Sequence, residues 1–274
     1  MRAEQFFRDF FKREKIELYG FLPLDDCKII RPYLLERCGV TGGSAVIFAV
    51  PYYSREAESE KRNVSLYAVP RDYHLYFKEL CQRFAKVFSE TFPNAKFGFF
   101  SDHSPIDEVN AAAVAGLGLI GRNHLLITEK YSSFIFLGEI VTDLELPYEP
   151  SEIKLCENCG LCSAACPVDL AVEECLSALT QKKGELTEGE KAKILCHGLV
   201  WGCDRCQMAC PHTQKAIKNE TIYSPVDFFS EKCLPELSAE LVEKMSDEDF
   251  GTRAYSWRGK ETILRNLQLF ENNK

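Results

Sequence analysis

Several features that define large classes of proteins are missing from this chain of 274 residues. No run of 18 apolar residues is present, which excludes a hydrophobic membrane span. The N-terminus, MRAEQFFRDFFKREK, lacks the apolar stretch and the small-residue cleavage site of a signal peptide. The net charge of −8 offers none of the basic excess of a general nucleic-acid binder. The five histidines form no metal-ligand spacing, and no Walker A, G-x-S-x-G or H-E-x-x-H motif occurs, so the common nucleotide, serine-hydrolase and zinc-protease sites are excluded.

Cysteine, in contrast, is abundant, with 13 residues in a chain that carries no signal peptide. This usage predicts a cytoplasmic protein whose thiols bind metal rather than form disulfides. Seven cysteines lie in two runs that end in Cys-Pro, and these runs read CENCGLCSAACP (156–167) and GCDRCQMACP (202–211). The first run has the C-x2-C-x2-C-x3-C-P spacing of bacterial ferredoxins, which favours iron–sulfur clusters. Zinc is the weaker alternative, because zinc sites usually pair two C-x2-C knuckles.

The two runs predict two [4Fe–4S] clusters with crossed ligation, because the fourth cysteine of a ferredoxin run binds the other cluster. The predicted ligands of the first cluster are Cys156, Cys159, Cys162 and Cys210. The second cluster would take Cys166, Cys203, Cys206 and one more thiolate. Val200 occupies the first position of the second run, so the missing ligand must come from elsewhere, with Cys175 and Cys196 as the candidates.

Hydrophobic periodicity predicts an α+β fold. The expected helices cover 3–17, 27–38, 72–92, 106–115, about 235–247 and 260–271, and the expected strands cover 44–51, 96–100 and 133–143. Residues 1–150 alternate helices and strands, which indicates an α/β domain that ends near Pro147 and Pro150. We expect a ferredoxin-like cluster domain of loops and short helices over 151–220 and a short helical segment over 221–274.

The order of motifs resembles that of bacterial epoxyqueuosine reductases, the cobalamin-dependent iron–sulfur enzymes of tRNA queuosine synthesis. Besides the ferredoxin run, the matching segments are YAVPRDYH (67–74), SDHSP (101–105), AGLGLIGRNHLLI (115–127), SSFIFLGE (132–139), CLSALT (175–180), WGCDRCQMACPH (201–212) and WRGKETILRN (257–266). The resemblance covers roughly residues 40–270. It implies an oxidoreductase that reduces epoxyqueuosine to queuosine in tRNA, acts as a monomer and takes electrons from an external low-potential donor. It also implies that Cys175, rather than Cys196, completes the second cluster.

The resemblance further implies cobalamin as a cofactor, bound between the N-terminal α/β domain and the cluster domain. We expect its walls in 120–127, 133–139 and 176–181, and the expected contacts are Tyr67, Arg122, Asn123, Leu126, Leu137 and Ser177. No D-x-H-x-x-G element is present, because Phe77 stands at the glycine position that follows Asp72-Tyr73-His74. A protein histidine is therefore not expected as the lower ligand of cobalt.

Asp102 lies at the position of the family's proposed proton donor, so we expect it to protonate the departing epoxide oxygen. This role would need burial that raises the pKa of its carboxyl group. Its flanking residues, FGFF before and Pro105-Ile106 after, are apolar enough for such burial. The structural alternative is that Asp102 caps a helix that begins near Pro105.

The chain also departs from the family pattern. Family members usually continue past the RN motif into a helical-repeat domain that helps grip tRNA, whereas this sequence ends at Lys274. Val109 and Arg122 replace the family's usual arginine and lysine. Two alternatives therefore remain: a related reductase of a small molecule, and an electron-transfer module that reduces a corrinoid protein.

Overall fold

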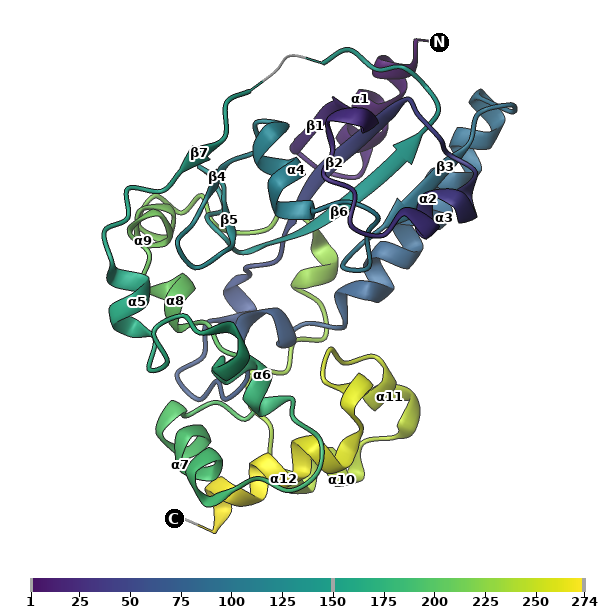
Figure 1. The fold of residues 1–274 in the computed structure, drawn as a ribbon. Coiled ribbons are helices and arrows are strands. Elements are labelled where there is room, and N and C mark those ends of the chain that lie inside the picture. The colour runs from purple at the N-terminus through teal and green to yellow at the C-terminus, as the bar shows by residue number, and fades with distance from the viewer. Residues whose placement is uncertain (1, 149–150, 273–274) are drawn as a thin grey trace.

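A four-stranded antiparallel sheet organises the N-terminal half of the computed structural model, which describes residues 2–148 and 151–272 (Figure 1). The strand order is β1-β2-β6-β3. The strands are β1 (Leu18–Pro23), β2 (Ser44–Pro51), β3 (Phe97–Phe100) and β6 (Ile135–Thr142). All eight residues of β2 are buried, because helices cover both faces of the sheet. This arrangement confirms the mixed helix-and-strand class, with an antiparallel sheet.

Aromatic side chains fill one face of the sheet. There α1 (Ala3–Arg13) packs on α3 (Tyr73–Thr91), and the Phe7 ring stacks on the Phe84 ring with centroids 5.7 Å apart. The helical spacing of the phenylalanines predicted both helices. The helix expected over 3–17 ends earlier, at Arg13, because the chain turns there into β1. Strand β1 was not predicted, since its residues are mostly half-exposed and include Gly20 and a final proline, which are poor strand formers.

The opposite face is covered by α4 (Glu108–Val114), whose alanines let it lie close to the strands. Helix α2 (Pro32–Cys38) flanks it, and only the second half of the helix expected over 27–38 exists, because Pro32 occupies the first turn.

A small three-stranded ladder follows, with β4 (Leu119–Ile120), β5 (Leu126–Ile127) and β7 (Lys154–Leu155). This ladder joins the glycine turn to the first cysteine, and Cys156 N–H donates to the Ile120 carbonyl at 3.0 Å.

Short helices and turns form the second half of the chain. The helices are α5 (Leu161–Ala165), α6 (Leu176–Thr180), α7 (Glu188–His197), α8 (Arg205–Met208), α9 (Pro211–Lys218), α10 (Ala239–Lys244), α11 (Asp247–Gly251) and α12 (Lys260–Glu271). The single helix expected over 235–247 is wrong: Ser238 caps α10, and Ser246 caps α11 after a break at Met245. Single 3₁₀ turns occur at Leu24–Asp26, Arg55–Ala57, Leu66–Ala68, Val172–Glu174, Asp227–Phe229 and Ser256–Arg258.

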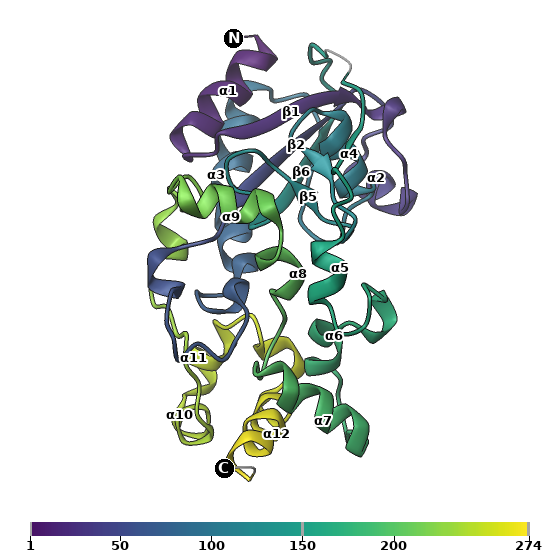
Figure 2. The same cartoon turned by 90° about the vertical axis from the view of Figure 1, so that its left-hand side faces the viewer.

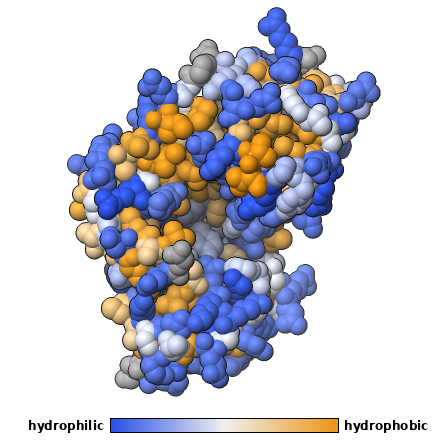
Figure 3. All heavy atoms as spheres, viewed as in Figure 1, coloured by the Kyte–Doolittle hydropathy of each residue, from blue (hydrophilic) through white to orange (hydrophobic). Residues whose placement is uncertain are grey.

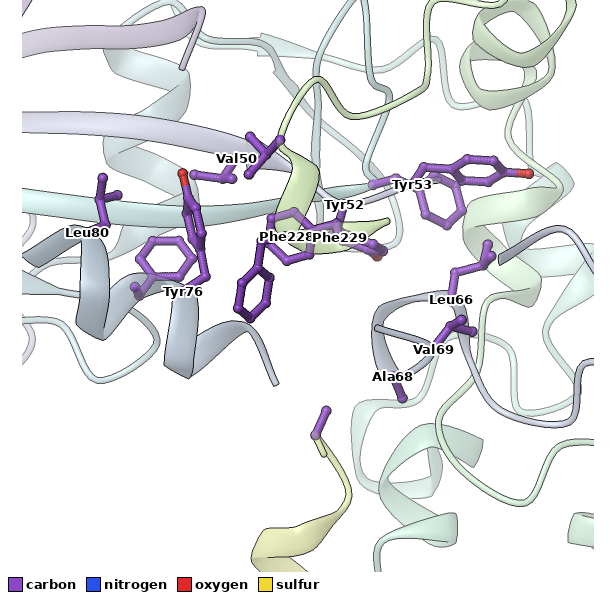
Figure 4. Close-up of a cluster of buried hydrophobic side chains, with 14 of the residues drawn as sticks. Val50, Tyr52, Tyr53, Leu66, Ala68, Val69, Tyr76, Leu80, Phe228 and Phe229 are labelled. Atoms are coloured by element: carbon purple, nitrogen blue, oxygen red, sulfur yellow. The ribbon is translucent and has the colours of Figure 1, made fainter. Parts of the chain in front are cut away.

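The two halves share one hydrophobic core. Figure 4 shows Phe228 and Phe229, from the second half, beside Tyr52 and Val50 at the end of β2. The Ser65 N–H also donates to the Trp201 carbonyl at 2.7 Å. Figure 2 shows α9 beside the sheet part and α12 at the far end of the molecule. Because this core crosses both expected boundaries, the division at 150 and 220 stays a prediction, and Pro150 itself lies outside the described residues.

Figure 3 shows a recess in the surface between the sheet part and the helical part, with hydrophobic side chains gathered above and below it. Within the two described ranges, no helix has the length and apolar character needed to cross a membrane.

Candidate functional site

Four cysteine side chains surround one cavity at the start of the cysteine-rich segment. They are Cys156, Cys159, Cys162 and Cys210, which is the set expected for the first cluster. The first three come from the loop before α5 and from α5 itself, whereas the fourth is the N-cap residue of α9. The fold thus joins residues from both Cys-Pro runs around one space.

A second cavity, of about 270 Å³, is lined by the other four cysteines, Cys166, Cys175, Cys203 and Cys206. Cys175 lies there directly before α6, on the wall that faces Cys203 and Cys206. Cys196 instead lines a separate, smaller cavity beside His197. The first cavity is about 30 Å³, so only the second already leaves room for a bulky group.

The donor chemistry of both cavities fits cubane clusters, since each offers four thiols, the ligands that hold a [4Fe–4S] cube. Backbone N–H groups point at two of the sulfurs, from Arg122 to Cys156 Sγ and from Leu170 to Cys166 Sγ, each at 3.3 Å. Such hydrogen bonds favour thiolates and tune cluster potentials. Across residues 2–148 and 151–272, no three cysteine, histidine or acidic side chains meet around a single metal-ion position.

Burial keeps the thiols of Cys203 and Cys206 in the second cavity protonated. It raises the pKa of Cys203 to about 12, and it also raises the pKa of Cys206, against a hydrogen bond from the Asn123 side chain. Metal binding would therefore release protons from this cavity. Asn123 lines both cavities, so the two four-thiol groups are neighbours.

A second polar site lies around Asp102, in the loop after β3. The Tyr73 hydroxyl donates to Asp102 Oδ2, and His74 Nε2 lies 3.2 Å from the same oxygen. The other ring nitrogen of His74, Nδ1, lies 2.8 Å from Asp72 Oδ1. Asp72 is the N-cap of α3 and also accepts the His74 backbone N–H. Helix α3 therefore presents Tyr73 and His74 to Asp102 from its first turn.

The electrostatics of this site differ from the expectation. Hydrogen bonds to Asp102 and Asp72 raise the pKa of His74 to about 10. Burial alone would raise the pKa of Asp102, but hydrogen bonds from His74 and Tyr73, with the charge of His74, more than offset it, so the pKa is lowered. The expected rise is wrong because the apolar flanks could not reveal the histidine that α3 brings in. At neutral pH the pair is carboxylate and imidazolium, with 52% of the Asp102 side chain exposed.

The helix-cap alternative for Asp102 is also wrong. The helix that follows is α4, which begins at Glu108, and its N-cap is Asp107, whose side chain accepts from the Asn110 N–H. Asp102 instead has a backbone φ of 63°, in the left-handed region that is uncommon outside glycine. Asp102 therefore does not cap α4.

Comparisons with known proteins agree with the motif order. Residues 38–103 match the family model described as "Epoxyqueuosine reductase QueG, DUF1730". The epoxyqueuosine reductase of Gloeobacter violaceus is 31% identical, over 76% of this chain and 68% of that protein. That of Cyclobacterium marinum is 31% identical, over 84% of this chain and 76% of that protein.

The chain belongs to the epoxyqueuosine reductase family.

Another member, from Listeria monocytogenes, is 32% identical, and the chain spans 61% of its length. Among solved structures, epoxyqueuosine reductase from Streptococcus thermophilus covers 100% of this chain, with a TM-score of 0.79 and 24% identity. A structure described as epoxyqueuosine reductase with an epoxyqueuosine-modified tRNA stem loop covers 97% of this chain and has a TM-score of 0.75 at 22% identity. These two structures show that the fold of the family extends over the whole chain.

The residues expected to contact cobalamin are dispersed between the two sites. Tyr67 lies between them: its hydroxyl accepts from Trp201 Nε1 at 2.8 Å, and its ring packs against Gly202, next to Cys203. The charges of Asp72 and Asp102 also act on the Tyr67 hydroxyl. A group placed between the second cavity and Asp102 would therefore meet Tyr67.

The other expected contacts divide as follows. Leu137 is half-buried. It lies next to the Asp102 loop, since its carbonyl accepts a hydrogen bond from Ser101 Oγ at 3.3 Å. Arg122 and Asn123 lie against the cysteine cavities, and Ser177 lies on α6, two residues after Cys175. Leu126 is only 3% exposed inside the apolar layer under α4, so its side chain could reach a cofactor only if that layer opened.

Sequence reasoning missed three members of the polar site. Tyr73 and His74 appeared in the matching segment 67–74 and in an incomplete cobalamin-binding motif, but neither was expected beside Asp102, although their place at a helix start after Asp72 was a usable signal. Glu139, a charged residue in the otherwise apolar strand SFIFLGEIVTD, is fully buried behind the Asp102 loop. A lone acid in a buried strand is costly unless it is paired or protonated, and this cost was the signal.

Proposed function

We propose that this protein reduces epoxyqueuosine to queuosine in tRNA, with two [4Fe–4S] clusters and cobalamin. The observation that carries the proposal is the sorting of eight cysteines into two neighbouring four-thiol cavities, the second of which lies next to Tyr67 and so toward Asp102. Family membership supports it, since the curated relatives are named epoxyqueuosine reductases. The related protein crystallised with an epoxyqueuosine-modified tRNA stem loop supports tRNA as the substrate.

The reaction requires two electrons and two protons, since an epoxide becomes an alkene and its oxygen leaves as water. One-electron clusters in adjacent cavities suit delivery from an external low-potential donor, first to the cavity with the exposed Cys159 and then to the cavity next to Tyr67. Bound cobalamin would supply the redox chemistry at the organic substrate. Tyr67, Leu137 and Ser177 would hold it, with Asn123 on the cluster side.

His74 and Asp102 supply the first proton in this proposal. The acidic proton resides on the His74 imidazolium, at Nε2, which lies 3.2 Å from Asp102 Oδ2. Asp102 passes this proton to the departing oxygen, because an alkoxide is far more basic than either side chain. Tyr73 keeps the carboxylate oriented, and its own ring is fixed by stacking on Phe136, with centroids 4.0 Å apart. Asp72 holds the imidazolium from behind, at Nδ1.

The histidines near this site are engaged by protein groups. His74 is held by two carboxylates, and His103 Nε2 lies 2.7 Å from the Tyr33 hydroxyl. This supports the proposal that neither histidine is a cobalt ligand.

The test is complementation of bacteria that lack epoxyqueuosine reductase, with queuosine measured in digested tRNA. The wild-type chain and Cys196→Ala should restore queuosine, whereas Cys175→Ala should leave epoxyqueuosine. Cys196 is a matched control, since it is exposed and lines a different cavity. A wild-type chain that holds both clusters and cobalamin yet leaves epoxyqueuosine untouched would show that the substrate is a different one.

A further inference from the structure

The most unusual buried group of the sheet is Glu139, in the middle of β6. Its side chain is 0% exposed, and its Cα is paired with Ile47 on β2 and Phe100 on β3. As an ionised carboxylate, Glu139 has no hydrogen-bond partner for either carboxyl oxygen among the described residues. An ionised carboxylate without a donor in such a layer is strongly unfavourable, so Glu139 is neutral in the folded protein.

Glu108, in the first turn of α4, is the group in reach of Glu139. Burial raises the pKa of both carboxyl groups, and each acts on the other. Glu108 Oε1 is likewise buried and lacks a donor. Two carboxyl groups in contact cannot both ionise, and they satisfy each other only when one proton lies between them.

Other charged groups around the pair are few. The Asp102 carboxylate acts on both glutamates, and the Arg31 guanidinium favours ionisation of Glu108. On the side of Glu139 lies the Cys27 thiol, whose pKa burial raises to about 12, so it stays neutral. Among the described residues, the charged groups that act most on the pair are thus the Arg31 cation and the Asp102 anion, which leaves the pair to share a proton.

The loop that carries Asp102 rests on this pair. The Asp102 backbone acts on the Glu108 carboxyl group and the Ser104 hydroxyl acts on that of Glu139, and each lowers the pKa of the carboxyl group that it acts on. Phe100, two residues before Asp102, is the β3 partner of Glu139. Asp102 itself has the uncommon φ of 63°, a conformation that persists only where surrounding contacts impose it.

We propose that Glu108 and Glu139 share one proton and that this proton holds the 101–104 loop, and with it Asp102, in place for proton delivery. Both are positioning residues, because they act through Asp102. When the pair loses its proton, two adjacent carboxylates beside a third anion repel one another, and the loop is released. The role in turnover rests on the proposed reductase function; the shared proton and the loop clamp do not.

The test variant is Glu139→Gln in the holoenzyme, since glutamine keeps the shape and donates to Glu108 at every pH. Glu145→Gln is the matched control, as Glu145 is exposed and lies just beyond the end of β6. Infrared spectra at pH 7 should show a protonated carboxylic acid band that is missing in Glu139→Gln and present in Glu145→Gln. Glu108→Gln should also lose the band, which provides a second variant if the first folds poorly.

Hydrogen exchange measures whether the 101–104 loop is held in place. The exchange rate of the peptide that contains this loop is measured in the wild type and in Glu139→Gln at the same pH, and the ratio of the two rates is compared. This ratio should stay near one below the apparent pKa of the pair and rise above it, because only the wild-type loop is released. Wild-type turnover should fall about tenfold per pH unit above the same pKa, as for loss of one essential proton. In Glu139→Gln this alkaline fall should move to higher pH.

Stability gives a further measurement. A carboxyl group with a raised pKa in the folded protein contributes stability that is present below its unfolded pKa, about 4.3, and is lost as pH rises toward the folded pKa. The melting temperature of Glu139→Gln should therefore rise relative to that of the wild type as the pH is raised from about 5 to 8.

The outcomes separate the two proposals. The proposal of a shared proton would be overturned if the wild type showed no carboxylic acid band. It would also be overturned if the band were unchanged in both Glu139→Gln and Glu108→Gln. A lost band with an exchange ratio near one at every pH would overturn the clamp. If the wild type does not reduce epoxyqueuosine but the band and exchange ratio behave as expected, the proposed function fails and this inference stands.

Discussion

Asp102→Asn is the sharpest test of the proton path, because it removes the charge at Asp102 and leaves the shape of the side chain. In the structure two donors meet at Asp102 Oδ2, from Tyr73 and His74. The asparagine oxygen can still accept one of them, but it can neither carry a transferable proton nor stabilise the imidazolium by charge. Folding, cluster content and cobalamin binding should survive the change.

The expected loss of turnover is about 10²–10⁴-fold, the usual contribution of a positioned acid. The pKa of His74, raised to about 10 in the wild type, should fall by about 1–3 units, which is the effect of one nearby carboxylate. Asp72 remains 2.8 Å from Nδ1 and would keep the His74 pKa above its ordinary value. Histidine side-chain NMR titration measures this shift directly.

Stability should change with a defined pH dependence. Since His74 has a raised pKa, its contribution is fully present below the unfolded pKa of about 6.5 and is lost as pH rises through about 10. The side chain of His74 is 56% exposed, so solvent screening limits the loss in Asp102→Asn to about 1 kcal/mol at pH 6, in the range of exposed ion pairs. The difference from wild type should vanish near pH 10.

Asp107→Asn is the matched control, because Asp107 caps α4 and asparagine caps equally well. It should keep near-normal turnover and an unchanged His74 titration. An Asp102→Asn enzyme that is folded, loaded and close to wild-type turnover would refute the proton path. Loss of turnover with an unchanged His74 pKa would refute the coupling between the two side chains.

Three further measurements test the cofactor sites and the packing between them. Reconstituted wild type should hold about eight irons and Cys175→Ala about half, whereas Cys196→Ala should keep them all; loss in Cys196→Ala alone would show the ligand assignment to be wrong. Co(II) EPR spectra of the cobalamin-loaded protein should be the same in wild type, His74→Ala and His103→Ala, and a nitrogen hyperfine signal that disappears in either variant would contradict the absence of a histidine ligand. Gly202→Ala should lower the free energy of unfolding by about 1–3 kcal/mol, because φ is +73° and the new Cβ would lie 2.0 Å from Ser65 Oγ; urea unfolding with an unchanged midpoint would count against this packing.

Local patterns in the sequence were enough for the cysteine runs and for the main helices and strands. The C-x2-C-x2-C-x3-C-P spacing places three thiols on one loop, and a chain segment this short leaves little freedom in their arrangement. The helices at 72–92 and 260–271 followed from hydrophobic periodicity, since the buried face of a helix repeats along its own sequence. The strand at 44–51 followed from a continuous apolar run that ends at Pro51. Strand β1 was not predicted, because its half-exposed residues show little of the hydrophobic pattern of a buried strand.

The polar site could not be derived in this way. Tyr73 and Asp102 are 29 positions apart, and nothing in either local segment specifies that they meet. The lowered pKa of Asp102 comes from His74 and Tyr73, which lie far from it in the sequence, whereas burial favours the opposite shift. Likewise, Glu139 meets Glu108 only because α4 folds back over β6.

The ligand sets show the same division. The sequence by itself determined the cysteine spacing that predicts iron–sulfur clusters. The crossed-ligation hypothesis grouped Cys210 with the first run, and in the structure Cys210 lines one cavity with Cys156, Cys159 and Cys162. The choice between Cys175 and Cys196 was open from spacing alone, because both lie outside the two runs. Only the tertiary structure places Cys175 on the wall of the second cavity and Cys196 on the wall of a separate, smaller cavity. The reason is physical: a ligand pattern within one loop is set by covalent geometry, whereas a ligand or proton partner from a distant segment is set by how helices and strands pack.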